Sequence, residues 1–228
     1  MGALLILTVL HFPLAAQFPQ PQQQVSVSLP EPVLEGSYTF EESLFMRRSV
    51  RRFTAEPVTL QQVSQLLWAA AGKTVDGHSG PTRSYPSAGA MHPLELFIAA
   101  GNVEGLEPGI YQYKWDTHAL VQISPGDYRR SLSDACAGQT APLQAPVTVV
   151  ISAMYSRTVS RYGSRGEMRY VPMDAGASAQ NIQLQAVSLG LGSVIIGAFQ
   201  DGAVQSLLKT PTAIPLLIMP VGVPYGEL

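Results

Sequence analysis

Apolar side chains recur every three or four positions in two long stretches of the chain, Thr59–Ala71 and Asp174–Leu189. Residues at this spacing lie on one face of a helix, and that face packs on the core. Thr59 is a residue type that caps helix starts, and Gly72 and Gly190 are typical helix ends. The spacing therefore predicts two long helices. Shorter helices are predicted over Gly126–Ala137 and Ala203–Leu208.

The remaining apolar runs are shorter and predict β-strands. Val147–Ala153, with the sequence VTVVISA, is typical of a strand that is buried on both faces. Further strands are predicted over Leu94–Ala100, Ile110–Trp115, Ala119–Ile123, Val194–Ile196 and Ile214–Val221. Strands and helices alternate without the regular period of βαβ units, which favours an α+β fold over a doubly wound sheet.

Two polar segments interrupt this pattern. Lys73–Met91 is rich in Gly, Ser, Pro and Asp and is too long for an ordinary turn. We expect a loop there, and a loop of this length is more typical of a binding site than of a spacer. Gln17–Pro32 is rich in Pro and Gln and is expected to form an extended tether. The globular domain should then cover residues 33–228.

Residues 1–16 contain a short apolar run, Ala3–Leu10. This run is too short for the roughly 20 residues of a membrane-spanning helix. It resembles the apolar part of a signal peptide, and a short apolar arm that packs on the domain is the alternative. A signal peptide predicts a periplasmic or secreted protein, whereas an uncleaved arm is compatible with a cytoplasmic one.

Composition narrows the possible functions. A chain of 228 residues with 46% hydrophobic side chains can build one good core. A net charge of −2 without a long run of like charges does not favour binding to nucleic acid. One cysteine, Cys136, excludes an internal disulfide, and the four widely spaced histidines do not predict a metal site. Any chemistry would therefore use an organic cofactor or no cofactor.

Three short segments could bind such a cofactor. RRSVRRF, residues 47–53, holds four arginines in six positions, which indicates either a solvated charged face or an anion site. YPSAGAMHP, residues 85–93, has small side chains that would let a planar ligand approach the backbone, although a structural turn explains it equally well. GLGSVIIGAF, residues 190–199, follows a predicted helix, whereas the glycine-rich dinucleotide-binding motif follows a strand.

These segments, together with RYGSRGEMRYVPMDAGASAQN and PLLIMPVG, resemble in order and spacing the FMN-dependent nitroreductase superfamily, and in particular its SagB-like branch of thiazole/oxazole dehydrogenases. The resemblance extends over about residues 33–224. It implies a nitroreductase fold, in which helices flank a mixed central sheet. It also implies an intertwined homodimer that binds FMN at the subunit interface.

The resemblance assigns a role to each segment. Arg47, Arg48 and Ser49 match the loop that holds the flavin phosphate and ribityl chain, and Arg51 matches a basic residue at the pyrimidine edge. The ring would be bordered by Ser87, Ala88 and Gly89, with His92 near the ribityl chain and phosphate. The backbone amides that face flavin N5 and O4 would come from Ile196, Gly197 and Ala198.

The sequence departs from the family pattern at several positions. Arg161-Tyr162 stands where azoline-oxidising members carry a Lys-Tyr pair as base and acid, and an arginine does not act as a base near neutral pH. Ala177 replaces a frequent histidine and Ala90 a frequent asparagine. The residues after Gly222 include no arginine to hold the phosphate, and no leader-peptide-binding segment is recognised.

The resemblance implies an FMN-dependent oxidoreductase with a ping-pong mechanism. NAD(P)H, or another donor, would deliver hydride to flavin N5, and a small organic acceptor would then be reduced in the same pocket. Arg161 and Tyr162 are the candidate catalytic residues. The alternative is a non-catalytic flavin or small-molecule binding module of the cell envelope.

Overall fold

The computed structural model describes residues 25–77 and 80–226. The predicted signal peptide or arm, residues 1–16, lies outside the described residues, as does the first half of the predicted tether. The strands are β1 (Ser26–Ser28), β2 (Val58–Thr59), β3 (Lys73–Gly77), β4 (Gly80–Arg83), β5 (Leu94–Ala100), β6 (Val103–Glu104), β7 (Gly109–Lys114), β8 (Ala119–Pro125), β9 (Val147–Ala153), β10 (Gly192–Ser193) and β11 (Ile214–Gly222).

Helices alternate with these strands, so the predicted α+β class is confirmed. The α-helices are α1 (Phe40–Met46), α2 (Leu60–Ala71), α3 (Arg129–Ala135), α4 (Ala141–Gln144), α5 (Tyr155–Tyr162), α6 (Val171–Ser188) and α7 (Asp201–Leu208). A 3-10 turn, η1 (Ala88–Ala90), and a π-helical turn, η2 (Gly166–Tyr170), complete the set. No helix among the described residues is long and apolar enough to cross a membrane.

Seven strands form the main sheet, in the order β1-β8-β7-β5-β9-β11-β10. Neighbouring strands in this sheet are antiparallel. Parallel pairing occurs between β2 and β6 and at an isolated bridge from Ser49 to Ser193. The strand β9 pairs along its whole length with β5 on one side and β11 on the other, which makes it the centre of the fold.

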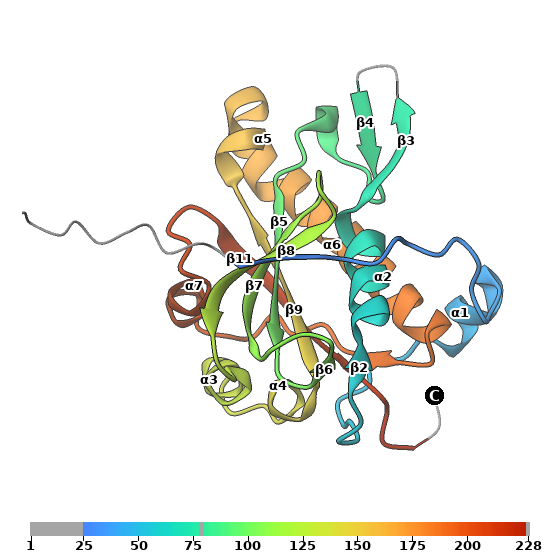
Figure 1. Ribbon diagram of the computed structural model, residues 1–228. Coiled ribbons are helices and arrows are strands. Elements are labelled where there is room, and N and C mark those ends of the chain that lie inside the picture. The colour runs from blue at the N-terminus through green and yellow to red at the C-terminus, as the bar shows by residue number, and fades with distance from the viewer. Residues whose placement is uncertain (1–24, 78–79, 227–228) are drawn as a thin grey trace, which may run out of the picture.

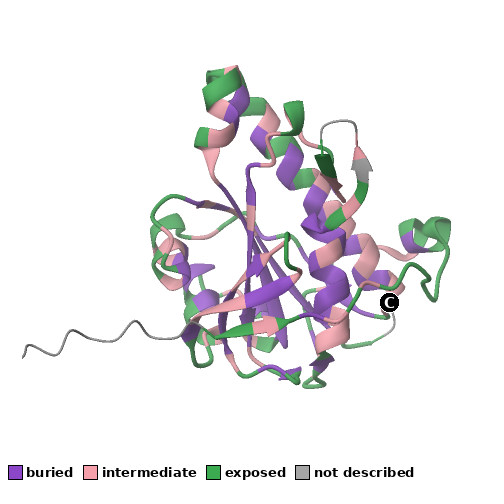
Figure 2. Cartoon of the chain, turned by 45° about the horizontal axis from the view of Figure 1, so that its top comes forward, coloured by how far each residue is buried: buried purple, intermediate pink, exposed green. Residues whose placement is uncertain are grey.

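Helices cover both faces of the sheet (Figure 1). The helices α2 and α6 pack on one face, where Leu96, Val149 and Ile151 enter a shared core. The helices α3, α4 and α7 pack on the other face, where Phe97 and Val150 point. Because side chains alternate along a strand, covering both faces buries every residue of β9, as predicted (Figure 2).

The local signals for α2 are all confirmed. The Thr59 hydroxyl accepts from the amide of Gln62, and the Gln62 side chain accepts from the amide of Thr59, so two of the free amides at the helix start are satisfied. The helix ends at Gly72, where a Cβ would collide with Trp68. The other long predicted helix, α6, starts three residues before the predicted Asp174.

The structure corrects several expectations outside the core. The segment Lys73–Met91, predicted as a loop, contains the antiparallel hairpin of β3 and β4. Part of the predicted tether forms β1, which pairs with β8, so the fold starts before residue 33. The helices α1, α4 and α5 and the turn η2 were not predicted, and α3 is shorter than the predicted Gly126–Ala137. The predicted strand Val194–Ile196 is reduced to an isolated bridge from Ile196 to Ile218, and the short strand β10 comes just before it.

Candidate functional site

The arginine-rich segment and the glycine-rich segment meet at one end of the sheet. After α1 the chain runs beside β10, where the amide of Val50 donates to the carbonyl of Ser193 at 2.9 Å. A Cβ on Gly192 would lie only 2.7 Å from the Val50 side chain, so this close approach requires glycine. The residues Arg48, Ser49 and Arg51 are exposed and Arg47 is half-buried. We call residues 47–51 and 192–198 together the arginine group.

The three residues that were expected to present amides to a flavin differ in their surroundings. The amide of Ile196 already donates to the carbonyl of Ile218 at 2.9 Å, and Ile196 is buried. Its amide is therefore already used by the sheet, unlike the arrangement expected from the resemblance. Gly197 and Ala198 are exposed, and a Cβ on Gly197 would meet nothing within 4 Å. Open space thus lies over this glycine.

The second set of predicted residues gathers at the other end of the sheet. Gly89, with a φ of 58°, lies against the hydroxyl of Tyr162 and the guanidinium of Arg161, because a Cβ on Gly89 would contact both. The Tyr162 ring makes an edge contact with Tyr170, with 4.9 Å between the ring centroids. The structure therefore brings together the candidate catalytic pair and the segment expected to border the ring. We call residues 87–92 with Arg161 and Tyr162 the loop group.

The sheet register gives the separation of the two groups. Ser193 lies in register, across β11, with Val147 of β9. Leu94, which directly follows the loop group and Pro93, pairs with Ala153 of β9. Val147 and Ala153 are six residues apart, or about 20 Å along an extended strand. The predicted cofactor residues of one chain thus form two groups at opposite ends of the sheet.

The loop group is held by a buried carboxylate that the sequence reasoning missed. The Ser87 hydroxyl donates to Oδ2 of Asp174 at 2.6 Å, and the amide of His92 donates to the Ser87 hydroxyl at 2.9 Å. Burial raises the pKa of Asp174, and hydrogen bonds from Ser87 and from the amide of Ala88 partly offset that rise. The sequence did contain a signal for this residue: Asp174 is the one acidic residue in a helix of otherwise apolar, small or uncharged side chains.

His92 lies between cationic side chains. Arg157 donates to the carbonyl of His92 at 3.0 Å and also pairs with Glu95. Burial, together with the charges of Arg83 and Arg157, lowers the pKa of His92 to about 4. The imidazole is therefore neutral near pH 7, and its Nδ1 atom is buried without a hydrogen-bond partner among the described residues.

A cavity of about 340 Å³ opens beside the loop group. It is lined by Pro86, Ser87, Ala88, Tyr170, Met173 and Asp174. Two of the residues predicted to border the ring, Ser87 and Ala88, therefore face an open space. The cavity is bounded on its other side by η2 and the first turns of α6.

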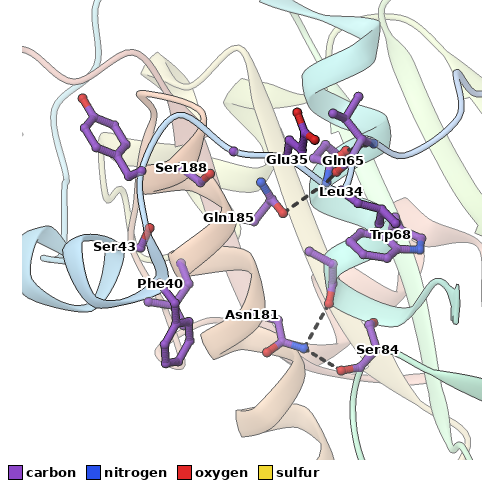
Figure 3. A pocket seen from close by; sticks show the side chains of 15 residues that line it. Leu34, Glu35, Phe40, Ser43, Gln65, Trp68, Ser84, Asn181, Gln185 and Ser188 are labelled. Carbon is purple, nitrogen blue, oxygen red and sulfur yellow. Dashed lines mark hydrogen bonds between the residues drawn. The ribbon is translucent and has the colours of Figure 1, made fainter. Parts of the chain in front are cut away.

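A second cavity, of about 410 Å³, lies between α2, α6 and the segment of residues 33–40 (Figure 3). Asn181 projects toward it from α6 and donates to the carbonyls of Ala69 and Ser84 at 3.0 Å. Gln65 of α2 donates to Gln185 of α6 at 3.2 Å. This cavity contains none of the predicted site residues, and no sequence motif indicated it.

Three other chemistries find no support in the described part of the chain. No group of three or more His, Cys, Asp or Glu side chains there could hold a metal ion. Ser178, in a segment that partly matches the nucleophile motif of hydrolases, is buried within α6 and donates to the carbonyl of Ala70. Burial also raises the pKa of the Cys136 thiol to about 11, which suppresses its reactivity.

Comparisons with known proteins show which proteins this chain is similar to. A Methanocaldococcus jannaschii protein, provisionally named a nitroreductase, is 42% identical over 182 residues, which cover 80% of this chain and 89% of that protein. The microcin B17-processing protein McbC of Escherichia coli is 26% identical over 143 residues, which cover 60% of this chain. This alignment spans only 52% of McbC, or about half its length.

Solved structures share the fold. A crystal structure from Ralstonia eutropha, provisionally described as a nitroreductase, has a TM-score of 0.74 at 28% identity and covers 89% of this chain and 90% of that chain. The NADPH:FMN oxidoreductase of Vibrio harveyi, complexed with NAD+, has a TM-score of 0.59 at 21% identity and covers 82% of this chain and 70% of that chain. These similarities confirm the expected nitroreductase fold. Because the model of the nitroreductase family also matches residues 44–223, the chain belongs to the nitroreductase family.

Proposed function

We propose that the protein is an FMN-dependent oxidoreductase that passes hydride, through flavin N5, from NAD(P)H or another donor to a small organic acceptor by a ping-pong mechanism. Family membership supports the general oxidoreductase role. One observation carries the finer proposal: the segments expected to contact flavin are paired in space, residues 47–51 with 192–198 and residues 87–92 with the Arg161-Tyr162 pair.

The arginine group is suited to a phosphate and an adjoining ring. Arg47, Arg48 and Ser49 offer guanidinium and hydroxyl donors, which bind phosphate oxygens with charge-assisted hydrogen bonds. Arg51, in the same segment, would face the pyrimidine edge, where a cation stabilises the negative charge of reduced flavin. The open space over Gly197 leaves room for a flat ligand beside exposed backbone. His92 is neutral near pH 7, so the positive charge must come from the arginines.

A homodimer would bring the two groups together on one flavin. Within one chain they lie at opposite ends of the sheet, and a second copy in the opposite orientation could supply the missing end. The surface also carries large apolar side chains that a partner would cover: Phe45 is 92% exposed, and Met168 and Met173 are 71% and 64% exposed. Met173 lines the cavity beside Ser87, so this apolar surface adjoins the loop group.

Arg161 and Tyr162 would act on the acceptor. An arginine side chain does not act as a base near neutral pH, so Arg161 cannot replace the base that the Lys of the Lys-Tyr pair provides. It can instead attract an electron-rich acceptor group, while the Tyr162 hydroxyl donates the proton that accompanies hydride. Bound FMN would supply the hydride chemistry. This arrangement favours reduction of an acceptor over oxidation of an azoline, although the similarity to McbC supports the SagB-like branch.

The alternative function is a non-catalytic flavin or small-molecule binding module of the cell envelope. The specific observation in its favour is the arginine at position 161, which removes the expected base. The apolar run Ala3–Leu10 supports a periplasmic or secreted location for either function, and the cytoplasm is the alternative.

The proposed activity is tested directly with purified protein reconstituted with FMN. We expect a yellow protein whose flavin absorbance bleaches anaerobically with NADH or NADPH and returns when an acceptor such as a quinone or nitroaromatic compound is added. A yellow protein whose flavin is neither reduced by NADH or NADPH nor reoxidised by an acceptor would favour the binding module. A protein that takes up no FMN would contradict both functions.

The role of the arginine group is tested by Arg47→Ala. Losing a charge-assisted hydrogen bond should weaken FMN binding by about 1.5 to 3 kcal/mol, which is roughly 10- to 150-fold in Kd. The measurement is a titration of apoprotein that follows flavin fluorescence. Arg130→Ala is the matched control, because Arg130 is an exposed arginine of α3 and lies outside both groups. Equal FMN affinities of the two variants would show that residues 47–51 form a solvated charged face and not an FMN phosphate site.

The neutrality of His92 predicts a pH dependence of stability. The pKa of His92 is about 4 in the folded protein and about 6.5 in an ordinary histidine. The unfolded chain therefore binds a proton in this range that the folded protein excludes, so stability is complete above about pH 6.5 and falls toward pH 4. Between about pH 7.5 and about pH 5, the Tm of the apoprotein should fall more in the wild type than in His92→Gln. Parallel decreases would show that His92 titrates normally.

A further inference from the structure

Asp174 is a buried carboxylate whose known partners are neutral. It lies in the first turn of α6 and is only 4% exposed. Among the described residues no lysine or arginine forms an ion pair with it, and its partners are the Ser87 hydroxyl and the amide of Ala88. Burying a carboxylate is costly unless hydrogen bonds compensate, so the donors from the loop must hold it.

The loop that provides these donors has an unfavourable backbone. Gly89, Ala90 and His92 have φ values of 58°, 55° and 43°. Side chains disfavour this left-handed region, and such residues persist where their surroundings leave no alternative conformation. The loop has few bonds of its own: the amide of Ala90 donates to the Ser87 carbonyl at 3.1 Å, and that of Met91 to the Ala88 carbonyl at 3.2 Å.

The Ser87 hydroxyl connects the two ends of this loop to α6. It donates to Asp174 at 2.6 Å and accepts from the amide of His92 at 2.9 Å. A hydroxyl that both donates and accepts is fixed in orientation, so removing the carboxylate frees the hydroxyl and, through it, His92. The cavity of about 340 Å³ lies directly against this connection, since Ser87, Ala88 and Asp174 all line it.

We propose that Asp174 is a positioning residue that acts through Ser87 to hold the strained Ser87–His92 loop in the shape that receives a flavin ring. The inference rests on the proposed flavin function, and it adds a residue whose effect is transmitted through the loop. Asp174 lies in the first turn of α6, where the helix, packed on the core, gives it a fixed position.

Hydrogen exchange of the apoprotein tests the connection without any flavin. In Ser87→Ala the amide of His92 loses its acceptor directly. In Asp174→Ala only the amide of Ala88 loses its acceptor directly. If Asp174 acts through Ser87, exchange at the amides of Ala90, Met91 and His92 should nevertheless accelerate at least tenfold in this variant. Ser87→Thr, which keeps the hydroxyl, should restore slow exchange. Ser206→Ala is the matched control, because it removes a serine hydroxyl bond on α7, far along the chain from this loop.

The flavin part is tested by FMN titration of the same variants. Ser87→Ala and Asp174→Ala should each weaken FMN binding about tenfold, and the double variant should be no weaker than either single one, because both act through one connection. Additive losses of FMN affinity in the double variant, or unchanged exchange at Ala90–His92 in Asp174→Ala, would overturn the inference. The proposed function would still stand in that case, provided that the wild-type protein binds FMN. Wild-type protein that binds no FMN would instead overturn the proposed function. The hydrogen-exchange measurement would still show whether Asp174 acts on the loop through Ser87.

Discussion

The burial of β9 on both faces is the constraint on which the rest of the structure depends. All seven of its residues are buried, because α2 and α6 cover one face and α3, α4 and α7 cover the other. A strand without a solvent face fixes its neighbours by register, since a shift of one residue would exchange the side chains of the two cores. β5 and β11 are therefore held in place along the length of β9. Each end of this three-stranded unit then carries one group of the candidate site.

The sequence predicted the elements that build this core. The period of apolar residues located α2 and α6, and the run VTVVISA located β9, because burial selects apolar side chains at fixed spacing. Some of the elements that escaped prediction are too short to show a period, such as α4, although its Ala141 is part of the core. The others are polar and peripheral. The hairpin of β3 and β4 has no alternating apolar pattern, and α5 and η2 lie in a charged, largely exposed segment whose helical turns bury few side chains. Their positions depend on contacts with distant residues.

The site was predictable in part for the same reason. The arginine-rich and glycine-rich segments stood out by composition, and the structure shows that they are neighbours. The bond from the Ile196 amide to Ile218 could not be predicted, because an apolar residue between glycines looks the same in sequence whether its amide pairs with a strand or faces a ligand. Asp174 was missed because its burial and its bond to Ser87, 87 residues away in sequence, follow only from the packing of α6 on the loop. Position in the fold, more than residue type, separates binding from supporting residues here.

The central claim is that residues at opposite ends of one sheet complete a single flavin site only across two copies of the chain. Mixed dimers of Arg47→Ala and Gly89→Val test it, since a side chain on Gly89 would collide with Tyr162. If each site combines two chains, a mixed dimer has one intact site and one that carries both substitutions. Differently tagged variants, co-expressed and purified through both tags, should then bind one FMN per dimer, while either variant alone binds little. Mixed dimers that bind no more FMN than the separate variants would contradict the account.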